Sequence, residues 1–532
     1  MRLELEERFV ERNASRWKQR ELEALGCALM TGFSIDGSLR SQSSLNVYRS
    51  DSALHSQPSL RYTDSITRKK STPLDYLLVV EDKSEADGAK GLDLSHGLFR
   101  SDGTPVPSFK LLDFNDELFL EVARGLGGML VSYEESARKV DASAGILHKI
   151  GQVVDPSEMD APFQGMKRFD VTYENEHCEY ICKSVVVKVK QGDQQALEDT
   201  VADIFRGKDE AFSNLPPIDY WTKGVLARDI YVFRDFQDVG EFWRIAPEIY
   251  YAHADPARGH HVIAMEDIAS QAVSEKLSLE PGEFSTMSEL KVIIRDISRF
   301  HAVHMGQTDS LRDRYANADK WLLAHDIQFK DARSFESIRV VHKRNVERYA
   351  DAYSGPFGRI VDKLVENMPE LIDEINRLAR EHKLETVIHG DFSTRNCCLR
   401  AGGERALVYD WELMAIGIPC IDITELLYFG LHPRDATRET FFELARFSHA
   451  CLVESVAAVG NPVAVCDFET YLHAFCLTWL RHCVLRTALF VYFQAGETLD
   501  CVVELAVEVT KQFVQVALAT LPESCPIRTK LG

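Results

Sequence analysis

The sequence predicts an α+β fold in which strands come first and helices dominate the C-terminal half. Apolar residues alternate with a strand-like period at 166–173 and 184–190, and again at 396–409. Apolar residues at helical spacing occupy 309–383 and 441–521. The change of period along the chain indicates two structural regions, one rich in strands and one mainly helical.

The composition sets broad limits on function. The chain has 532 residues, which allows more than one domain, and 45% hydrophobic with 27% charged residues is ordinary for a globular protein. A formal net charge of -21 argues against nucleic acid as a partner, because that binding depends on basic patches. Twelve cysteines behind a charged N-terminus, without a long uncharged apolar run, favour reduced thiols, no membrane span and a cytoplasmic location.

Residues 1–140 carry no functional motif, and we expect them to form an N-terminal extension. Residues 1–30 are typical of a charged amphipathic helix. Residues 34–73 are rich in Ser, Arg, Asp and Thr with little apolar content, which predicts disorder. A chain starting near residue 140 should then fold by itself, unless the apolar segment 109–131 completes the domain that follows.

The strands 166–173 and 184–190 are separated by a polar turn and should pair antiparallel. Lys188 lies within a run of valines, and burying a lysine there is unfavourable unless it meets an anion. Lys188 is therefore a candidate anion-binding residue. The alternative is an edge strand with a solvated face, because Lys190 lies on the same side and edge strands often carry lysine.

The segment His389–Asn396 reads His-Gly-Asp-Phe-Ser-Thr-Arg-Asn, and Asp410-Trp411-Glu412 begins fourteen residues after Asn396. This spacing supplies an acid, an amide and a second acid, the groups that metal-assisted phosphoryl transfer uses. Asp391 would accept the proton of an acceptor hydroxyl. Asn396 and Asp410 would offer hard oxygen ligands to Mg²⁺.

The local pattern around these residues predicts a β-hairpin. Short strands are expected at 396–400 and 405–409, around the Gly-containing turn 401–404. A hairpin brings Asn396 and Asp410 to the same end of adjacent strands, as two ligands of one metal require. The alternative is an ordinary hairpin with acidic residues near it by chance.

These segments resemble the catalytic and metal-binding loops of the aminoglycoside phosphotransferase and choline kinase group, and most closely its ecdysteroid kinase-like (CHK kinase-like) branch. The resemblance covers roughly 163–521 and implies a two-lobed, protein-kinase-like α+β fold. It places a small β-rich N-lobe with a hinge at 141–268 and a large helical C-lobe at 269–532. It implies ATP- and Mg²⁺-dependent phosphorylation of a hydroxyl on a small molecule, with a steroid-, choline- or aminoglycoside-like acceptor.

The resemblance also implies residue roles. Lys188 would bind the ATP phosphates, and Asp229 stands where the family has the glutamate that pairs with this lysine. Backbone groups around Met265 and Glu266 would contact adenine at the hinge. Arg395 would contact the transferring phosphate and offset its charge.

Two features keep a catalytically inactive, nucleotide-binding scaffold open as an alternative. Only Gly151 and Gly165 punctuate the region where a glycine-rich phosphate loop is expected, and Asp229 is one methylene shorter than glutamate. A solvated acid on an amphipathic helix is the other interpretation of Asp229. A protein kinase is less favoured, because Gly390 replaces the usual arginine and no Ala-Pro-Glu motif follows the metal loop.

Three further patterns predict structural roles. His301 and His304 lie three residues apart on a helix but lack the other ligands of a strong metal motif. Asp422 with Glu425 forms a capping-box pattern that should open a helix and support the catalytic loop. Cys397 is expected to pack in the hairpin rather than to act as a nucleophile.

Overall fold

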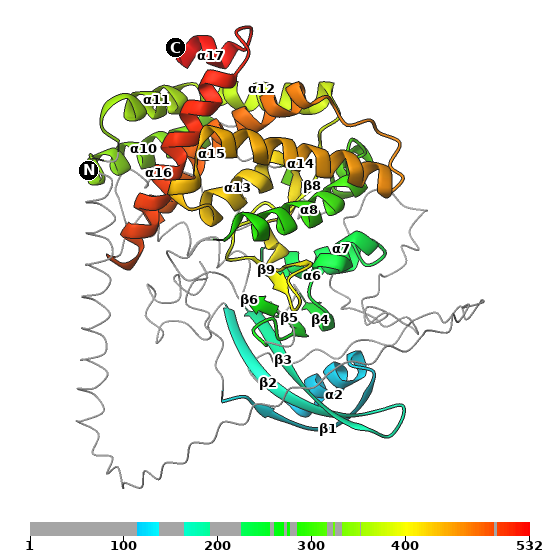
Figure 1. The fold of residues 1–532 in the computed structure, drawn as a ribbon. Helices are drawn as coiled ribbons and strands as arrows, with labels where there is room; N and C mark the ends of the chain where they lie inside the picture. Colours follow the sequence, from blue (N-terminus) through cyan, green and yellow to red (C-terminus); the bar gives the residue numbers. More distant parts are fainter. Residues whose placement is uncertain are drawn as a thin grey trace, which may run out of the picture. The chain divides into compact units, whose positions relative to one another are not determined.

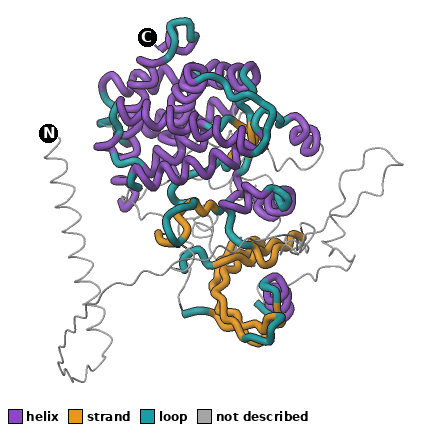
Figure 2. The backbone as a smooth tube through the Cα atoms, turned by 45° about the vertical axis from the view of Figure 1, so that its right-hand side comes forward, coloured by secondary structure: helices purple, strands orange, loops and turns teal. Residues whose placement is uncertain are grey.

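The computed structural model describes the residues 114–137, 164–191, 225–255, 260–270, 274–276, 285–316, 323–324, 332–351, 353–493 and 497–531. All of them belong to one unit of the chain, Lys70–Gly532. The predictions for 1–30 and 34–73 lie outside the described residues. Within the described part, strands gather in one region and helices in another, which confirms the expected two-lobed α+β fold (Figures 1 and 2).

The N-lobe is built on a five-stranded antiparallel sheet with the order β1-β2-β3-β5-β4. Its strands are β1 (Gly128–Glu135), β2 (Gln164–Asn175), β3 (Tyr180–Gln191), β4 (Ile249–Asp255) and β5 (His260–Glu266). The predicted pairing of the two valine- and lysine-containing strands is confirmed, with Lys188 opposite Met166. Because β3 is bonded on both sides, by β2 and β5, the edge-strand interpretation of Lys188 and Lys190 is wrong.

Part of the expected N-terminal extension belongs to the N-lobe, where it forms a helix that packs on the sheet and a strand at the edge of the sheet. Helix α2 (Asp116–Gly125) begins at Asn115, whose side chain accepts a hydrogen bond from the Leu118 amide at 3.1 Å. Its apolar face packs on β2, where the Phe119 and Phe169 rings lie 4.6 Å apart. Strand β1 then adds the outer edge of the sheet (Figure 1). The N-lobe therefore includes residues before the expected boundary at residue 140. Helix α2 is part of it, because α2 covers apolar surface that the strands alone would expose.

The C-lobe consists mainly of helices. Helix α8 begins with a capping box formed by Thr286 and Glu289, and it packs against α14, while α15 packs against α16. Its helices are α8 (Met287–His304), α9 (Asp309–Ala316), α10 (Ala332–Arg348), α11 (Gly355–Glu366), α12 (Met368–Glu381), α13 (Cys420–Gly430), α14 (Arg438–Ala458), α15 (Phe468–Phe493), α16 (Glu497–Thr520) and α17 (Pro526–Leu531). Among the described residues, no helix combines the length and apolar character that crossing a membrane requires.

Short elements connect the sheet and the helices. In the described part of the chain between β3 and β4 lie the helices α6 (Val225–Asp235) and α7 (Gly240–Ile245). Two small three-stranded sheets follow, with the strand orders β10-β9-β6 and β7-β11-β8. Their strands are β6 (Ser274–Lys276), β7 (Leu323–Ala324), β8 (Thr386–Ile388), β9 (Cys397–Arg400), β10 (Ala406–Val408) and β11 (Ala415–Gly417). The predicted hairpin is confirmed, since β9 and β10 pair antiparallel with Cys397 opposite Val408. The described residues also include the 3₁₀ turns η6 (Trp411–Leu413) and η7 (Pro433–Asp435).

Candidate active site

The loop that carries Asp391 is hydrogen-bonded to a buried aspartate of helix α13. The backbone amides of His389 and Gly390 donate to the Asp422 carboxylate at 2.8 and 3.0 Å, and His301 Nε2 lies 2.9 Å from the same group. The predicted capping box of Asp422 is wrong, because α13 has no side-chain cap and Asp422 lies within its first turn. Its predicted support of the catalytic loop is formed through these bonds instead.

Gly390 has a backbone requirement of its own. Its φ is 81°, in the left-handed region that glycine adopts without strain. This turn directs the chain from β8 into Asp391, while the amide of Gly390 stays bonded to Asp422. A residue with a side chain at this position would strain the loop.

Asn396 is bonded directly to Asp391. Its amide nitrogen donates to Asp391 Oδ2 at 2.9 Å and to the Asp391 carbonyl at 2.8 Å. Since this nitrogen faces Asp391, the amide oxygen is the atom that Asn396 could offer to a cation, and Mg²⁺ prefers such oxygen ligands. The loop is closed by backbone bonds from Ser393 to Asp391 and from Asn396 to Ser393, each 2.9 Å.

The catalytic loop and the metal loop are joined through Tyr409. The Tyr409 amide donates to the Asn396 carbonyl at 3.0 Å, and His389 Nε2 lies 2.9 Å from the Tyr409 carbonyl oxygen. Trp411 is fully buried against His389 and the aromatic rings of α7 and α8. Asp410 lies between these anchors with a left-handed φ of 63°. An aspartate held in this conformation is uncommon and is maintained by the surrounding contacts.

Lys188, on the N-lobe strand β3, contacts the metal loop. Its Nζ is 2.8 Å from Asp229 Oδ2 and 2.6 Å from Asp410 Oδ1. Lys188 and Asp229 are 6% and 3% exposed, so the solvated-acid interpretation of Asp229 is wrong. The shorter aspartate still reaches the lysine at hydrogen-bonding distance.

The sequence reasoning missed three residues that belong to this network. Lys190 Nζ is in close contact with Glu412 Oε2 and lies 3.5 Å from Asp229 Oδ2. Arg228 Nη1 donates to the Glu412 carbonyl at 2.9 Å, which ties α6 to the metal loop. The available signal for Lys190 was the period of two along β3, which places it on the same face as Lys188, whereas Glu412 lies in the 3₁₀ turn η6 and carries no such signal.

The network has a strong effect on the protonation of its members. Burial by itself would raise the pKa of Asp410, but the charges of Lys188 and Lys190 outweigh it and lower that pKa to about 2. Burial and the Asp410 charge raise the pKa of Glu412. Burial disfavours the charged form of Lys188, yet the neighbouring carboxylates hold its pKa well above the usual range. Asp410 and Lys188 are therefore ionised at neutral pH.

The donor set fits a hard divalent cation. Carboxylate oxygens of Asp229, Asp410 and Glu412 lie within 4.8 Å of one another. The Asp410 side chain is the most exposed of the three, at 36% against 4% and 16%. Asp410 is therefore the carboxylate most accessible to an ion, and Asn396, which immediately precedes β9, lies at the same end of the hairpin.

A second group of potential ligands lies in the helical lobe. Glu374, His473 and Cys525 approach one another closely enough for a metal. However, Arg377 Nε and Nη2 donate to the two Glu374 oxygens, each at 2.8 Å. Because this ion pair already occupies both oxygens, we assign no ion to the group.

The predicted hinge residues lie at the end of β5. The Glu266 amide donates to the Glu248 carbonyl at 2.9 Å, so it is committed to the sheet, and Arg400 Nη2 bonds the Glu266 carboxylate at 2.9 Å. Met265 lies opposite Val186 in the same ladder. The chain beyond β5 is fixed by the buried pair of Asp267 with an arginine of β2, Arg168, at 2.8 and 3.0 Å.

Two other expected residues have their own surroundings. The Arg395 guanidinium lies over the Phe429 ring of α13, 5.6 Å from its centre. Cys397 is buried and its thiol pKa is raised by burial, which makes it a poor nucleophile and agrees with the packing role predicted for it.

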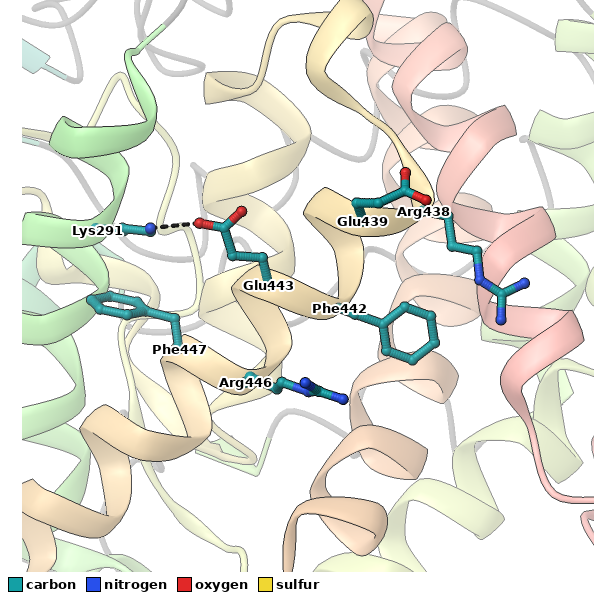
Figure 3. Close-up of a pocket in the computed structure, with 7 residues that line it drawn as sticks. All are labelled: Lys291, Arg438, Glu439, Phe442, Glu443, Arg446 and Phe447. Carbon is teal, nitrogen blue, oxygen red and sulfur yellow. Dashed lines mark hydrogen bonds and ion pairs between the residues drawn. The ribbon is translucent and has the colours of Figure 1, made fainter.

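A hollow of about 780 Å³ lies on the surface between α8 and α14, away from the residues described above (Figure 3). There Lys291 bonds Glu443 at 2.6 Å, and the Arg438 guanidinium lies 5.5 Å from the Phe442 ring centre. It shares no residue with the lysine–carboxylate network.

Comparison with solved structures gives low identities. A choline kinase from Cryptosporidium parvum is 11% identical with a TM-score of 0.35, covering 71% of this chain and 98% of the other. An amicoumacin kinase in complex with AMP-PNP, Ca²⁺ and its antibiotic is 12% identical with a TM-score of 0.32, covering 65% and 85%. An aminoglycoside phosphotransferase from Streptomyces rimosus with ADP and streptomycin is 16% identical with a TM-score of 0.27, covering 58% and 92%.

No curated protein sequence matches the chain. A family model, by contrast, matches residues 166–461, more than half of the 532 residues. The matched range contains Lys188, Asp229, Asp391, Asn396 and Asp410, which the two lobes bring together. The chain belongs to the ecdysteroid kinase-like family.

Proposed function

We propose that this protein transfers the γ-phosphoryl group of ATP, with Mg²⁺, to a hydroxyl group of a small molecule. The observation that carries the proposal is the convergence of two constellations. Asp391 is bonded to Asn396 at 2.9 Å, and Asp410, on the adjoining loop, is bonded to Lys188 at 2.6 Å. A base, an amide, a carboxylate and a lysine at one site are the groups that phosphoryl transfer uses.

In this proposal Asp391 accepts the proton of the acceptor hydroxyl as its oxygen attacks the γ-phosphorus. The bond from the γ-phosphorus to the bridging oxygen breaks, and ADP leaves with that oxygen. Lys188 binds phosphate oxygens of the nucleotide, and Asp229 orients the lysine through their 2.8 Å contact. Asp410 and the amide oxygen of Asn396 would hold Mg²⁺, which neutralises charge on the phosphates when bound.

The remaining assignments concern the two ends of ATP. Backbone groups at Met265 and beyond Glu266 are proposed to contact adenine, with Asp267 and Arg168 fixing that segment. Arg395 is proposed to approach the transferring phosphate from its position over Phe429. The acceptor is proposed to be a hydroxylated small molecule of a steroid-, choline- or aminoglycoside-like class.

The test has two stages, because a catalytically inactive scaffold would bind nucleotide without transferring phosphate. Binding of ATP is first measured by calorimetry with and without Mg²⁺. The full chain is then incubated with ATP, Mg²⁺ and panels of hydroxylated steroids, amino alcohols and aminoglycosides, with mass spectrometry to detect a phosphorylated product. A product that forms only with Mg²⁺ supports the proposal, and binding without any product or ATP turnover would favour the scaffold.

A further inference from the structure

Lys190 is a second buried cation at the candidate nucleotide site. It is 3% exposed and lies on the same face of the interior strand β3 as Lys188. Its ammonium contacts Glu412 closely and Asp229 at 3.5 Å. A lysine this deeply buried is unfavourable unless its charge is compensated, so these two contacts explain why it is tolerated.

The two lysines differ in which carboxylates they contact most closely. Lys188 holds Asp410 and Asp229 at 2.6 and 2.8 Å but is 3.7 Å from Glu412. Lys190 holds Glu412 much more closely. The two lysines carry two positive charges against the three negative charges of the carboxylates, and the Arg228 guanidinium, which donates to the Glu412 carbonyl, adds a third positive charge.

Nucleotide binding would have to rearrange only part of this network. Lys188 would turn from Asp410 to the phosphates, and Asp410 would turn to the cation. At that moment Glu412, only 3.7 Å away, is the carboxylate placed to capture Lys188. Its contact with Lys190 is what opposes that capture.

We propose that Lys190 is a positioning residue, which holds Glu412 and shares Asp229 so that Lys188 is released to the nucleotide. This inference rests on the proposed function. Lys190 acts through Glu412 and Asp229 and does not itself touch the reacting atoms. Loss of its charge would leave Lys188 alone with three carboxylates and would raise the free energy needed to release it.

The test is a charge-rescue cycle on the full chain, with the dissociation constant of Mg·ATP measured by calorimetry at 25 °C and thermal melts alongside. The variants are Lys190→Met, Glu412→Gln and the double variant, which returns the local net charge to that of the parent. The matched control is Lys183→Met, a lysine of the same strand that pairs with Glu248 at 3.0 Å but is 36% exposed.

Lys190→Met is expected to weaken Mg·ATP binding by about tenfold or more, the usual consequence of breaking one partner of a buried charge pair. The double variant should recover most of that affinity, and Glu412→Gln alone supplies the single-variant reference that completes the cycle. Lys183→Met should change the affinity by less than about threefold, as for an exposed ion pair.

Two results would overturn the proposal. A double variant as weak as Lys190→Met would mean that Lys190 meets the nucleotide or that Glu412 is needed itself. A lowered melting temperature with an unchanged dissociation constant would mean a purely structural role. If Lys190→Met does not fold, the double variant, in which the charge is restored, is measured in its place. Parental affinity in that variant supports the positioning role, and weak binding contradicts it. Failure of the parent protein to bind Mg·ATP refutes the proposed function. An Mg·ATP dissociation constant that is the same in the parent and in Lys190→Met refutes only this inference.

Discussion

Lys188 Nζ lies 2.6 Å from Asp410 Oδ1, so a lysine of the N-lobe sheet and an aspartate of the C-lobe metal loop, 222 residues apart, form one ion pair. In the proposed reaction both groups have other partners, the phosphates and the cation. Nucleotide binding must therefore exchange this internal pair for two external contacts. The exchange gives the site a testable dependence on metal.

Replacing Asp410 should uncouple nucleotide binding from Mg²⁺. Asp410→Asn keeps the shape of the side chain but removes the charge that binds the cation and holds Lys188. The affinity gain that Mg²⁺ gives to ATP should fall at least about tenfold, a loss that even outer-shell changes at metal sites cause. Binding of ATP without metal should tighten, because Lys188 is released. An unchanged Mg²⁺ effect in calorimetry would show that Asp410 does not hold the ion.

Replacing Asp391 should affect turnover rather than binding. Asp391→Asn removes the proposed proton acceptor, and the rate of phosphate transfer should fall by about 10²-fold or more, as loss of a general base usually does. The affinity for Mg·ATP should stay within about threefold, since Asp391 is placed to meet the acceptor and not the nucleotide. Asp435→Asn, at an exposed aspartate of η7, is the control. Near-parental turnover in Asp391→Asn would remove Asp391 from the mechanism.

The contribution of α2 to the N-lobe can be measured with two neighbouring residues. Phe119 is fully buried against Phe169, whereas the next residue, Leu120, is 43% exposed. Phe119→Ala should lower the free energy of unfolding by about 3–5 kcal/mol, and Leu120→Ala by less than about 0.5 kcal/mol. Chemical denaturation of the two variants checks the difference. Equal, small effects would mean that α2 does not stabilise the sheet and that residues before 140 are dispensable.

Acidification should destabilise the protein partly through His473. Burial lowers the pKa of His473. The Glu374 carboxylate opposes this shift and the charge of Arg377 adds to it, so the net direction is downward. The unfolded chain then binds the proton more readily, so stability from this group is present above the unfolded value of about 6.5 and is lost as pH falls below it. His473→Gln should reduce the fall in melting temperature between pH 7.5 and 5.5. The control is His177→Gln, at a histidine that is 71% exposed. Identical pH profiles for the parent and His473→Gln would contradict the assignment.

Much of the fold and of the candidate site could be predicted from local patterns. The hairpin between Asn396 and Asp410 depends on a short turn between two apolar segments, and it forms as predicted. The strand pair containing Lys188 follows from the period of two along 166–190, and it is also formed. Such features need only neighbouring residues to specify them.

Other predictions failed where a distant partner decided the outcome. The Asp422 pattern indicates a capping box. In the buried site, however, its carboxylate accepts hydrogen bonds from two backbone amides of the catalytic loop instead. The edge-strand interpretation of Lys190 failed because β5, which comes some seventy residues later, covers that side of β3. No local pattern around Lys190 predicts its contact with Glu412, which lies 222 residues later in the chain.

By itself, the sequence determined which segments are strands and helices, and which short motif carries an acid, an amide and a second acid. These depend on periodicity and spacing within a few residues. Only the tertiary structure decided that α2 completes the sheet, that Asp229 reaches Lys188, and that Lys190 is buried against Glu412. The reason is physical: the protonation and partners of a buried charge are fixed by the groups that surround it in space, and a sequence orders those groups along the chain only.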